Sequence, residues 1–305
     1  MGKLTSCIKS FGIYYTFVAG INSISNKIFK NSKLSHLLHH YKYRLVSQYL
    51  LKKYGYIIER SKKEKYENRI GNSNYIWICW WQGLENAPKL VKACVANIQK
   101  KYGKEKHIVI VDKHNYDKYV DIPFVILNKV QKGNFPLTFL ADILRFCLLD
   151  KYGGIWIDAT VFLNKKISID QYCFFSIKHN LYTHWHVCRG KWSTFFIASG
   201  ANNTGVSIIK EILLAYAKNE NTLMAYLLLD AVIGIVYDKV DVFKKQVDDV
   251  PVNNDRVFLM QHNLNTEIDQ FQIPADINKL SYKFKYKSKI NGKETVYGYI
   301  LQMLN

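Results

Sequence analysis

The sequence has little that would favour a membrane-spanning, disulfide-rich or disordered protein. None of its apolar runs reaches the roughly 18 residues that a membrane-spanning helix needs. The nearest, residues 11–21, is about half as long as such a helix. The six cysteines include no C-x-x-C pair, so zinc-ribbon and thioredoxin-like folds lack support, and reduced thiols in a cytosolic protein are expected. Proline occurs only 5 times and 49% of the residues are hydrophobic, so long disordered tails are not expected.

Acidic residues are also scarce, and the excess of positive charge is concentrated at one end. The chain has 43 Lys/Arg against 24 Asp/Glu, which gives a net charge of +19. Residues 1–70 hold 14 of the basic residues and 3 of the acidic ones, a net +11 in under a quarter of the chain. Such a balance is typical of a protein with a polyanionic partner: anionic lipid, nucleic acid or a diphosphate substrate. Lysines that only keep the surface soluble are the other explanation.

Residues 1–70 are predicted to form a basic helical region that associates with a membrane surface. Apolar residues recur there at three- and four-residue spacing, namely Leu34, Leu37, Leu38, Tyr41, Leu45 and Tyr49. Residues 11–21 follow Lys3 and Lys9 as in a signal peptide, but no small-x-small cleavage site comes after them. They fit an interfacial helix better, with its apolar face in lipid and lysines at the headgroups. The charged run 60–69 is expected to be a solvated linker or helix end.

Residues 71–305 alternate between short apolar segments and helical patterns, which predicts an α/β domain. The expected architecture is a mostly parallel sheet flanked by helices. In the first half of this domain, strands are expected at 75–81, 107–111, 123–127 and 155–157, and helices at 88–102 and 137–152. In the second half, strands are expected at 173–177, 194–198, 282–286 and 295–301, and helices at 206–217 and 223–237.

The helix expected at 137–152 carries two charges in an otherwise apolar middle. Asp142 and Arg145 are three residues apart, so they lie on one face of the helix. Buried charges are costly unless they are paired or face a polar cleft. The two residues therefore form either a local buried ion pair or the wall of a site. In a site, Asp142 would accept from sugar hydroxyls and Arg145 would address phosphate or a carboxylate.

Two glycines follow this helix and lead into a short strand with Asp158 at its end. Gly153 and Gly154 allow a sharp turn from helix to strand. Ligands bind beyond the carboxyl ends of strands in parallel sheets, which is where Asp158 is expected. In an extended chain Asp158 and Thr160 project to the same side. Oxygen ligands spaced in this way can hold Mg²⁺ or Mn²⁺, which stabilise the charge that develops on a departing diphosphate. An Asp that only caps a turn is the alternative.

These residues resemble a known donor-site signature. Asp142-Ile-Leu-Arg145 and Tyr152-Gly-Gly-Ile-Trp-Ile-Asp158 are similar to glycosyltransferases with a DXD motif, among them yeast-type initiating mannosyltransferases and glucosylating clostridial toxins. The closer resemblance is to the bacterial capsular polysaccharide synthesis protein family. Its first strand and turn resemble the block from Trp80 to Pro88, and its later blocks resemble 191–199 and 250–254. The likeness runs from about residue 75 to residue 264.

The resemblance implies a GT-A-like fold over residues 71–305 and assigns roles within it. Asp142, Arg145 and Asp158 would be catalytic. Donor binding would use Trp80, Trp81, Gln82, Asp142, Arg145, Thr160, Lys191, Asn253 and Asn254, with a tryptophan beside the nucleobase. The metal candidates are Asp158, Thr160 and His262, because C-terminal residues often close the donor site in the families resembled.

Thr160 departs from the resembled motif, which has a second Asp at this position. The departure puts the divalent cation, Mg²⁺ or Mn²⁺, in doubt, because a hydroxyl is a poor metal ligand beside a carboxylate. Either Asp158 holds the metal together with waters and the diphosphate, or cations such as Arg189 or Lys191 replace it. Asp230, inside an apolar helix, and the histidines His184 and His186 are secondary candidates.

The resulting hypothesis is a nucleotide-sugar-dependent glycosyltransferase that uses a UDP-sugar. The acceptor would be a growing, lipid-linked capsular or exopolysaccharide. The protein would be cytoplasmic and peripheral on the inner face of the bacterial membrane. No residue is a convincing inverting base, which favours retention. The alternatives are a basic nucleic-acid-binding protein and an inactive scaffold. The first lacks any recognisable nucleic-acid-binding motif, so no nucleic-acid partner is expected; the second is motivated by Thr160.

Overall fold

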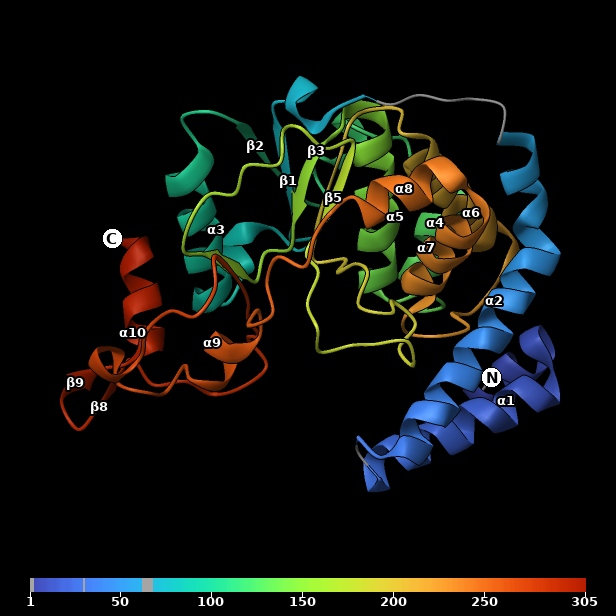
Figure 1. Ribbon diagram of the computed structural model, residues 1–305, viewed down its shortest axis with the longest axis horizontal. Helices are drawn as coiled ribbons and strands as arrows, with labels where there is room; N and C mark the ends of the chain where they lie inside the picture. Colours follow the sequence, from blue (N-terminus) through green and yellow to red (C-terminus); the bar gives the residue numbers. More distant parts are fainter. Residues whose placement is uncertain (1–2, 30, 62–67) are drawn as a thin grey trace.

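Two long helices form the N-terminal part of the protein in the computed structural model, which describes residues 3–29, 31–61 and 68–305. Helix α1 (Lys3–Ile28) is interrupted at Gly12, where φ is +84°, and folds back along α2 (Lys33–Ser61). Helix α2 packs against α6 (Thr204–Asn219) and α7 (Leu228–Lys239) (Figure 1). The prediction of N-terminal helices is confirmed. The linker expected at 60–69 lies mostly outside the described residues.

The centre of the molecule is a five-stranded sheet in the order β2-β1-β3-β6-β5. Its strands are β1 (Tyr75–Cys79), β2 (His107–Val111), β3 (Gly154–Ile157), β5 (Phe174–Ser176) and β6 (Phe196–Ser199). Strand β1 is parallel to β2 and β3, whereas β6 is antiparallel to both β3 and β5. Four of the five strands therefore run in one direction. The expected α/β architecture with a mainly parallel sheet is confirmed.

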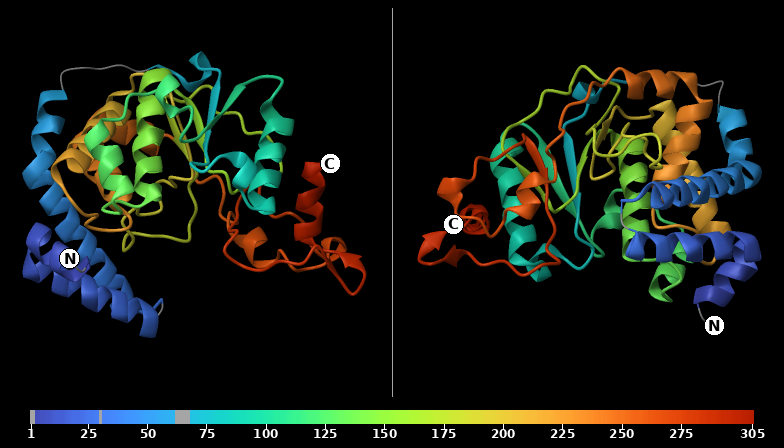
Figure 2. Two further views of the ribbon diagram at one scale, coloured as in Figure 1. Left: turned by 180° about the vertical axis from the view of Figure 1, so that it is seen from behind. Right: turned by 60° about the horizontal axis from the view of Figure 1, so that its bottom comes forward.

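Helices cover both faces of this sheet because its strands are apolar on both sides. Ile76 and Ile78 of β1 pack toward α3 (Lys89–Tyr102) in one hydrophobic cluster. Trp77, between them, packs into the larger cluster with α5 (Leu137–Tyr152), α6 and α7. The smaller helices are α4 (Phe124–Gln131) and α8 (Asp241–Asp248). Figure 2 shows α3 on one side of the sheet and the bundle of α5 to α8 on the other.

The chain after α8 forms a separate layer at the end of the molecule opposite the N-terminal helices (Figures 1 and 2). Strand β4 (Val161–Leu163) pairs with β7 (Ile277–Lys279), and β8 (Lys289–Ile290) pairs with β9 (Lys293–Glu294). Helices α9 (Leu259–His262) and α10 (Val296–Leu301) complete this layer. Short 3-10 helices lie at Ile70–Asn72, Leu84–Asn86, Tyr116–Lys118, Ile268–Gln270 and Gln302–Leu304.

Three predicted strands are wrong. Residues 123–127 form the start of α4, because Pro123 (φ −52°) precedes a first helical turn and only Ile126 of that helix is fully buried. Residues 295–301 form α10, whose N-terminus is capped by the Thr295 hydroxyl accepting from the Gly298 amide. Residues 282–286 form no strand. Short apolar runs have no periodicity long enough to separate strand from helix. The other predicted strands and helices are confirmed within a few residues, except that α7 begins five residues after the expected start at 223.

Candidate active site

A turn of two glycines positions the residue that follows β3. Helix α5 ends at Tyr152, and Gly153 and Gly154 both have positive φ values, +65° and +97°. A Cβ on Gly154 would lie 2.3 Å from the Tyr75 carbonyl oxygen, and a Cβ on Gly153 would lie 2.6 Å from the Ala201 nitrogen. Other residues would therefore be both strained and obstructed here. The turn lets β3 run back beside α5 and end next to that helix's Asp142 and Arg145.

Arg145 joins two carboxylates that come from different elements. Its Nη1 donates to Asp142 Oδ1 at 2.7 Å, and its Nη2 donates to Asp158 Oδ1 at 3.2 Å. The guanidinium lies over the Trp156 ring, 4.8 Å from its centroid, and Trp156 Nε1 also donates to Asp158 Oδ1. The Arg145 side chain is 5% exposed, whereas those of Asp142 and Asp158 are 21% and 28% exposed. Arg145 is thus a buried support beneath two carboxylates that reach solvent.

Lys279 is the second cation of this cluster. Its Nζ donates to Asp158 Oδ2 at 2.8 Å and to Thr160 Oγ1 at 2.6 Å. Asp158 and Thr160 do face the same side, as the i, i+2 spacing predicts. Lys279 is not among the residues predicted from the sequence, because it lies 121 residues after Asp158. Only the pairing of β4 with β7 brings it there, and no local motif in the sequence marks that pairing.

The three acidic side chains in this region differ in their protonation behaviour. Burial raises the pKa of Asp142 to about 6, although Arg145 partly offsets this effect. Burial also raises the pKa of Asp158, but Lys279 and Arg145 outweigh it, so this pKa lies below its ordinary value. Asp230, in the first turn of α7, has its pKa raised to about 7 by burial, although it accepts a hydrogen bond from Trp192 Nε1 at 3.0 Å. Asp158 therefore stays anionic at neutral pH, whereas the carboxyl groups of Asp142 and Asp230 change their protonation state close to neutral pH.

The aromatic block predicted to contact the nucleobase follows β1 directly. Because β1 and β3 are parallel, this block and Asp158 lie at the same edge of the sheet. Trp80 packs edge-on against Tyr282 at 5.5 Å, and Trp81 packs against Tyr116 at 5.3 Å. The carbonyl of Gln82 accepts from the Asn86 side chain. Trp80 Nε1 is buried and has no partner among the described residues.

Two of the later predicted residues hold the segment that carries Lys279. Asn254 Nδ2 donates to the Ile277 carbonyl at 2.7 Å. Asn253 Nδ2 donates to the Ser176 carbonyl at 3.2 Å, while its Oδ1 accepts from the Lys178 amide. The Lys279 amide in turn donates to the Val257 carbonyl. The block 250–254 therefore ties β7 to the loop after β5, which fixes the position of Lys279.

The other predicted cations and the predicted histidine lie elsewhere. Lys191 Nζ pairs with Asp248 Oδ1 at 2.7 Å, and Arg189 forms two hydrogen bonds with Asp238. His262 is the last residue of α9, and its side chain forms no hydrogen bond or ion pair within residues 3–29, 31–61 and 68–305. None of these three side chains contacts Asp158 in that part of the chain.

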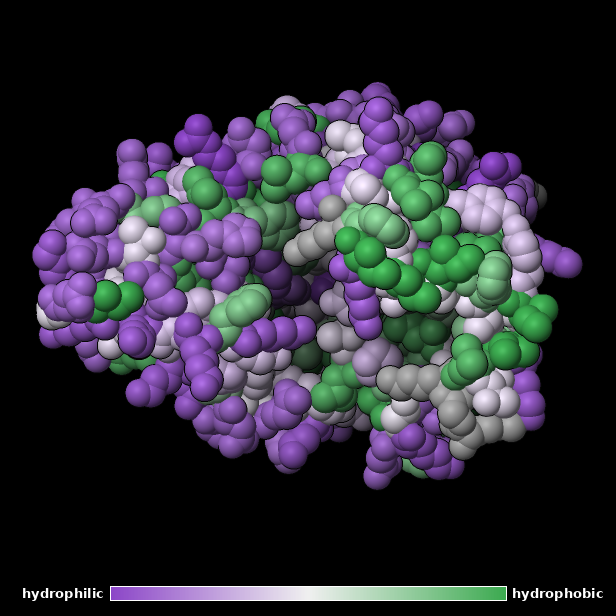
Figure 3. Space-filling model, turned by 90° about the horizontal axis from the view of Figure 1, so that it is seen from below, coloured by the Kyte–Doolittle hydropathy of each residue, from purple (hydrophilic) through white to green (hydrophobic). Residues whose placement is uncertain are grey.

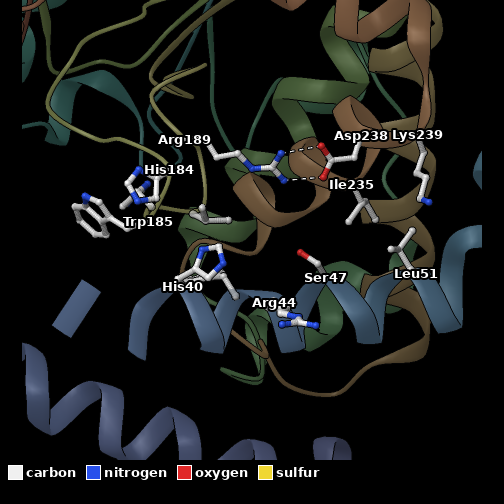
Figure 4. A pocket seen from close by; sticks show the side chains of 13 residues that line it. His40, Arg44, Ser47, Leu51, His184, Trp185, Arg189, Ile235, Asp238 and Lys239 are labelled. Atoms are coloured by element: carbon white, nitrogen blue, oxygen red, sulfur yellow. Dashed lines mark hydrogen bonds and ion pairs between the residues drawn. The ribbon is translucent and has the colours of Figure 1, made fainter. Parts of the chain in front are cut away.

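A separate cavity of about 330 Å³ lies between α2, the segment 184–189 and α7 (Figure 4). His40 and Arg44 of α2 face it from one side, and Trp185 lies at its edge. The Arg189–Asp238 pair forms the opposite wall, as the dashed lines in Figure 4 show. None of the residues that contact Asp158 lines this cavity. Figure 3 shows a different, polar hollow between the C-terminal layer and the hydrophobic face of the N-terminal helices.

The fold and the cluster around Asp158 define an α/β protein with a charged, partly solvent-accessible site at the carboxyl edge of a mainly parallel sheet. The chain belongs to the capsular polysaccharide synthesis protein family, whose sequence profile matches residues 25–300. The match covers most of the chain and begins inside the predicted N-terminal region. It confirms the resemblance found in the sequence, whereas the division at residue 70 stays a prediction.

Individual relatives match smaller parts of the chain. It is 30% identical over 106 residues to the O-glycosyltransferase braB of Annulohypoxylon truncatum and 28% identical over 100 residues to the O-glycosyltransferase PaGT of Phomopsis amygdali. These matches cover 32% and 30% of this chain, and the chain spans only 25% of each relative. Among solved structures, PaToxG glycosyltransferase superposes with a TM-score of 0.42 at 15% identity, over 69% of this chain and 89% of that one.

Proposed function

We propose that the protein is a glycosyltransferase that moves a sugar from a nucleoside diphosphate-sugar, with a UDP-sugar as the first candidate, to a growing capsular or exopolysaccharide. Family membership and the partial matches to O-glycosyltransferases support this class of reaction. The observation that carries the proposal is the anionic Asp158 held between Arg145 and Lys279 at the carboxyl edge of the sheet. Such an edge is where α/β proteins bind nucleotides.

Each part of the cluster has a role in this proposal. The sugar hydroxyls donate to the exposed part of the Asp142 carboxylate, and the nucleobase lies near Trp80 and Trp81 at the end of β1. Arg145 acts as a positioning residue, because both of its terminal nitrogens are engaged by Asp142 and Asp158. The cations of the cluster stabilise the negative charge on the diphosphate as it departs. Retention at the sugar carbon, which the resemblance to other glycosyltransferases implies, stays part of the proposal.

The N-terminal helices support a lipid-linked acceptor at a membrane surface. Within the described residues no helix combines the length and apolar character needed to cross a membrane. Yet α1 exposes an apolar stripe at helical spacing: Ile13 (73%), Phe17 (65%), Ile24 (58%) and Ile28 (65%). The exposed lysines Lys9, Lys27 and Lys33 accompany it, and Figure 3 shows the hydrophobic side chains gathered on this face. An apolar stripe with adjacent lysines fits an anionic lipid surface such as the inner face of a bacterial membrane.

A thermal-shift screen tests the proposed reaction class. Purified protein is heated with UDP-, GDP- and CMP-sugars, each with Mn²⁺ and with EDTA. A donor at about 100 times its Kd stabilises the folded state by about 2.7 kcal/mol, which corresponds to a rise of about 4 °C in Tm for a chain of this size. One donor class is expected to produce this rise in the wild type but not in Asp158→Asn. If every donor leaves Tm unchanged, or if the variant responds equally, the proposed donor site is refuted.

A further inference from the structure

The oxygen atoms that would bind a divalent cation at this site are already occupied by cationic and neutral donors. Asp158 Oδ1 accepts from Arg145 and Trp156, and its Oδ2 accepts from Lys279. Thr160 Oγ1, which stands where the resembled motif has its second carboxylate, also accepts from Lys279. Among the described residues, no group of three or more His, Cys, Asp or Glu side chains is arranged to hold a metal ion. The residues at the end of β3 therefore do not fit a resident divalent ion.

Lys279 lies where that ion would have to bind, and the backbone holds it there. Val161 is the direct partner of Lys279 in the β4–β7 pair, and the Leu280 amide donates to the Thr160 carbonyl at 2.9 Å. The Lys279 ammonium also lies 5.5 Å from the centroid of the Phe195 ring. A divalent ion between Asp158 and Thr160 would have to displace this ammonium or be repelled by it and by Arg145.

The ammonium retains one unused donor. A lysine carries three N–H donors, and Asp158 and Thr160 take two of them. The side chain is 22% exposed, so the remaining N–H can reach a ligand from solvent. No third partner of Nζ occurs within the part of the chain that the structure describes. This geometry gives Lys279 one donor to offer to an anionic ligand while two others fix its direction.

We infer that Lys279 takes the place of the divalent cation and binds the diphosphate of the donor directly. This inference rests on the proposed function. In the transfer step the bond between the sugar C1 and the diphosphate oxygen breaks, and its electron pair stays on the diphosphate. The acceptor oxygen bonds to C1 and releases its proton to solvent. Lys279 keeps its own protons and stabilises the new negative charge through its third N–H. The reaction then needs no metal ion.

Calorimetric titration with UDP and GDP tests this role. The protein is titrated in EDTA and again in Mn²⁺, as the wild type, Lys279→Met and Lys279→Arg. The wild type is expected to bind one of the two nucleotides with a Kd that changes less than twofold between EDTA and Mn²⁺. Lys279→Met, which keeps an unbranched side chain one atom shorter but loses the charge, should weaken binding at least tenfold, and Lys279→Arg should recover part of the affinity. Lys293→Met is the control, because Lys293 also pairs with a carboxylate at 2.9 Å but lies in the C-terminal layer.

Binding of Mn²⁺ itself gives a second readout that does not depend on the nucleotide. Electron paramagnetic resonance should detect no stoichiometric binding of Mn²⁺ to the wild type when total Mn²⁺ is about 0.1–1 mM. These concentrations are on the order of the dissociation constants of the weakest calcium sites in proteins. Combining Lys279→Ala with Thr160→Asp removes the ammonium and supplies a second carboxylate, so this double variant should gain a Mn²⁺ site. Thr160→Asp alone should not, because Lys279 still fills the position.

The outcomes separate the two proposals. Nucleotide binding that requires Mn²⁺, or a stoichiometric Mn²⁺ site on the wild type, overturns the role of Lys279 and leaves the proposed function intact. Equal nucleotide affinity in Lys279→Met and the wild type also overturns it. If neither UDP nor GDP binds with or without Mn²⁺, the proposed function fails and the role of Lys279 toward a diphosphate fails with it. Circular dichroism of each variant establishes that a loss of binding is not a loss of fold.

Discussion

Replacing Arg145 with methionine should destabilise the protein in a pH-dependent manner. Methionine keeps an unbranched stem against the Trp156 ring but removes the charge that joins Asp142 and Asp158. Removing one partner of a buried ion pair typically costs about 3–5 kcal/mol. The two carboxylates here are 21% and 28% exposed and keep some contact with water, and Lys279 still pairs with Asp158. We therefore expect a loss of about 2–4 kcal/mol at pH 8.

The loss should be smaller at pH 5 because of Asp142. Its pKa is raised to about 6 even with Arg145 in place, so the carboxyl is mostly protonated at pH 5 and charged at pH 8. Arg145 lowers this pKa, and its removal raises it further. Each additional unit corresponds to about 1.4 kcal/mol of stability that is lost at pH 8 and retained at pH 5. The pH dependence thus reports on Asp142 specifically.

Guanidinium denaturation followed by tryptophan fluorescence at pH 5 and pH 8 measures this difference. Arg145→Lys is the matched variant, because it keeps a positive charge but lacks the two-armed geometry that reaches both carboxylates. It should lose less stability than Arg145→Met at pH 8. An equal loss at both pH values, or a loss below about 1 kcal/mol at pH 8, would refute the buried network as described, since a surface pair contributes no more than that.

Three further predictions concern other parts of the protein. Asp230→Asn should flatten the pH dependence of the free energy of unfolding. Burial raises the folded-state pKa of Asp230 to about 7. The stability that the protonated Asp230 contributes is therefore complete below about pH 4 and is lost as the pH rises through 7. Denaturation at pH 5 and 8 checks this, and parallel curves for variant and wild type would contradict it. Phe17→Glu should reduce cosedimentation with phosphatidylglycerol vesicles severalfold. Phe284→Glu is the control, because Phe284 is equally exposed at 65% but lies in the C-terminal layer, and it should not reduce cosedimentation. If both variants cosediment equally with the vesicles, the α1 face is not the lipid-binding surface. Gly154→Ala should destabilise by about 1–3 kcal/mol because of its positive φ and the adjacent Tyr75 carbonyl; a Tm within 1 °C of the wild type would show that the turn tolerates a side chain.

Local signals explain which parts of the fold were predictable. The helix at 137–152 was predicted with both ends correct, because a long apolar pattern stops at Gly153-Gly154. Strand β3 follows from the same glycines and from the apolar run Ile155-Trp156-Ile157, and the structure buries all four of its residues. By contrast, the stretches at 123–127 and 295–301 are short and apolar, and their helical state depends on a preceding proline and on a Thr295 cap.

The candidate site divides in the same way. Asp142, Arg145 and Asp158 lie within 17 consecutive residues, so spacing along one helix and one strand was enough to group them. Lys279 joins them only through a strand pair formed by segments more than 100 residues apart, and its three-residue strand has no distinctive pattern. Lys191 and Arg189 were reasonable candidates from charge alone. The acidic partners Asp248 and Asp238 that engage them lie about 50 residues later in the chain.

The most direct test of the central claim is the release of nucleoside diphosphate from nucleotide sugars by the wild type and by Asp158→Asn. Asn keeps the shape of the side chain and an acceptor for Trp156 Nε1 but removes the charge that pairs with Arg145 and Lys279. With the preferred donor, the wild type should release diphosphate at least 100 times faster than the folded variant, a difference of about 2.7 kcal/mol in transition-state stabilisation. Equal rates in the two proteins, or no release from any nucleotide sugar by the wild type, would contradict the assignment of Asp158 to a glycosyltransferase donor site.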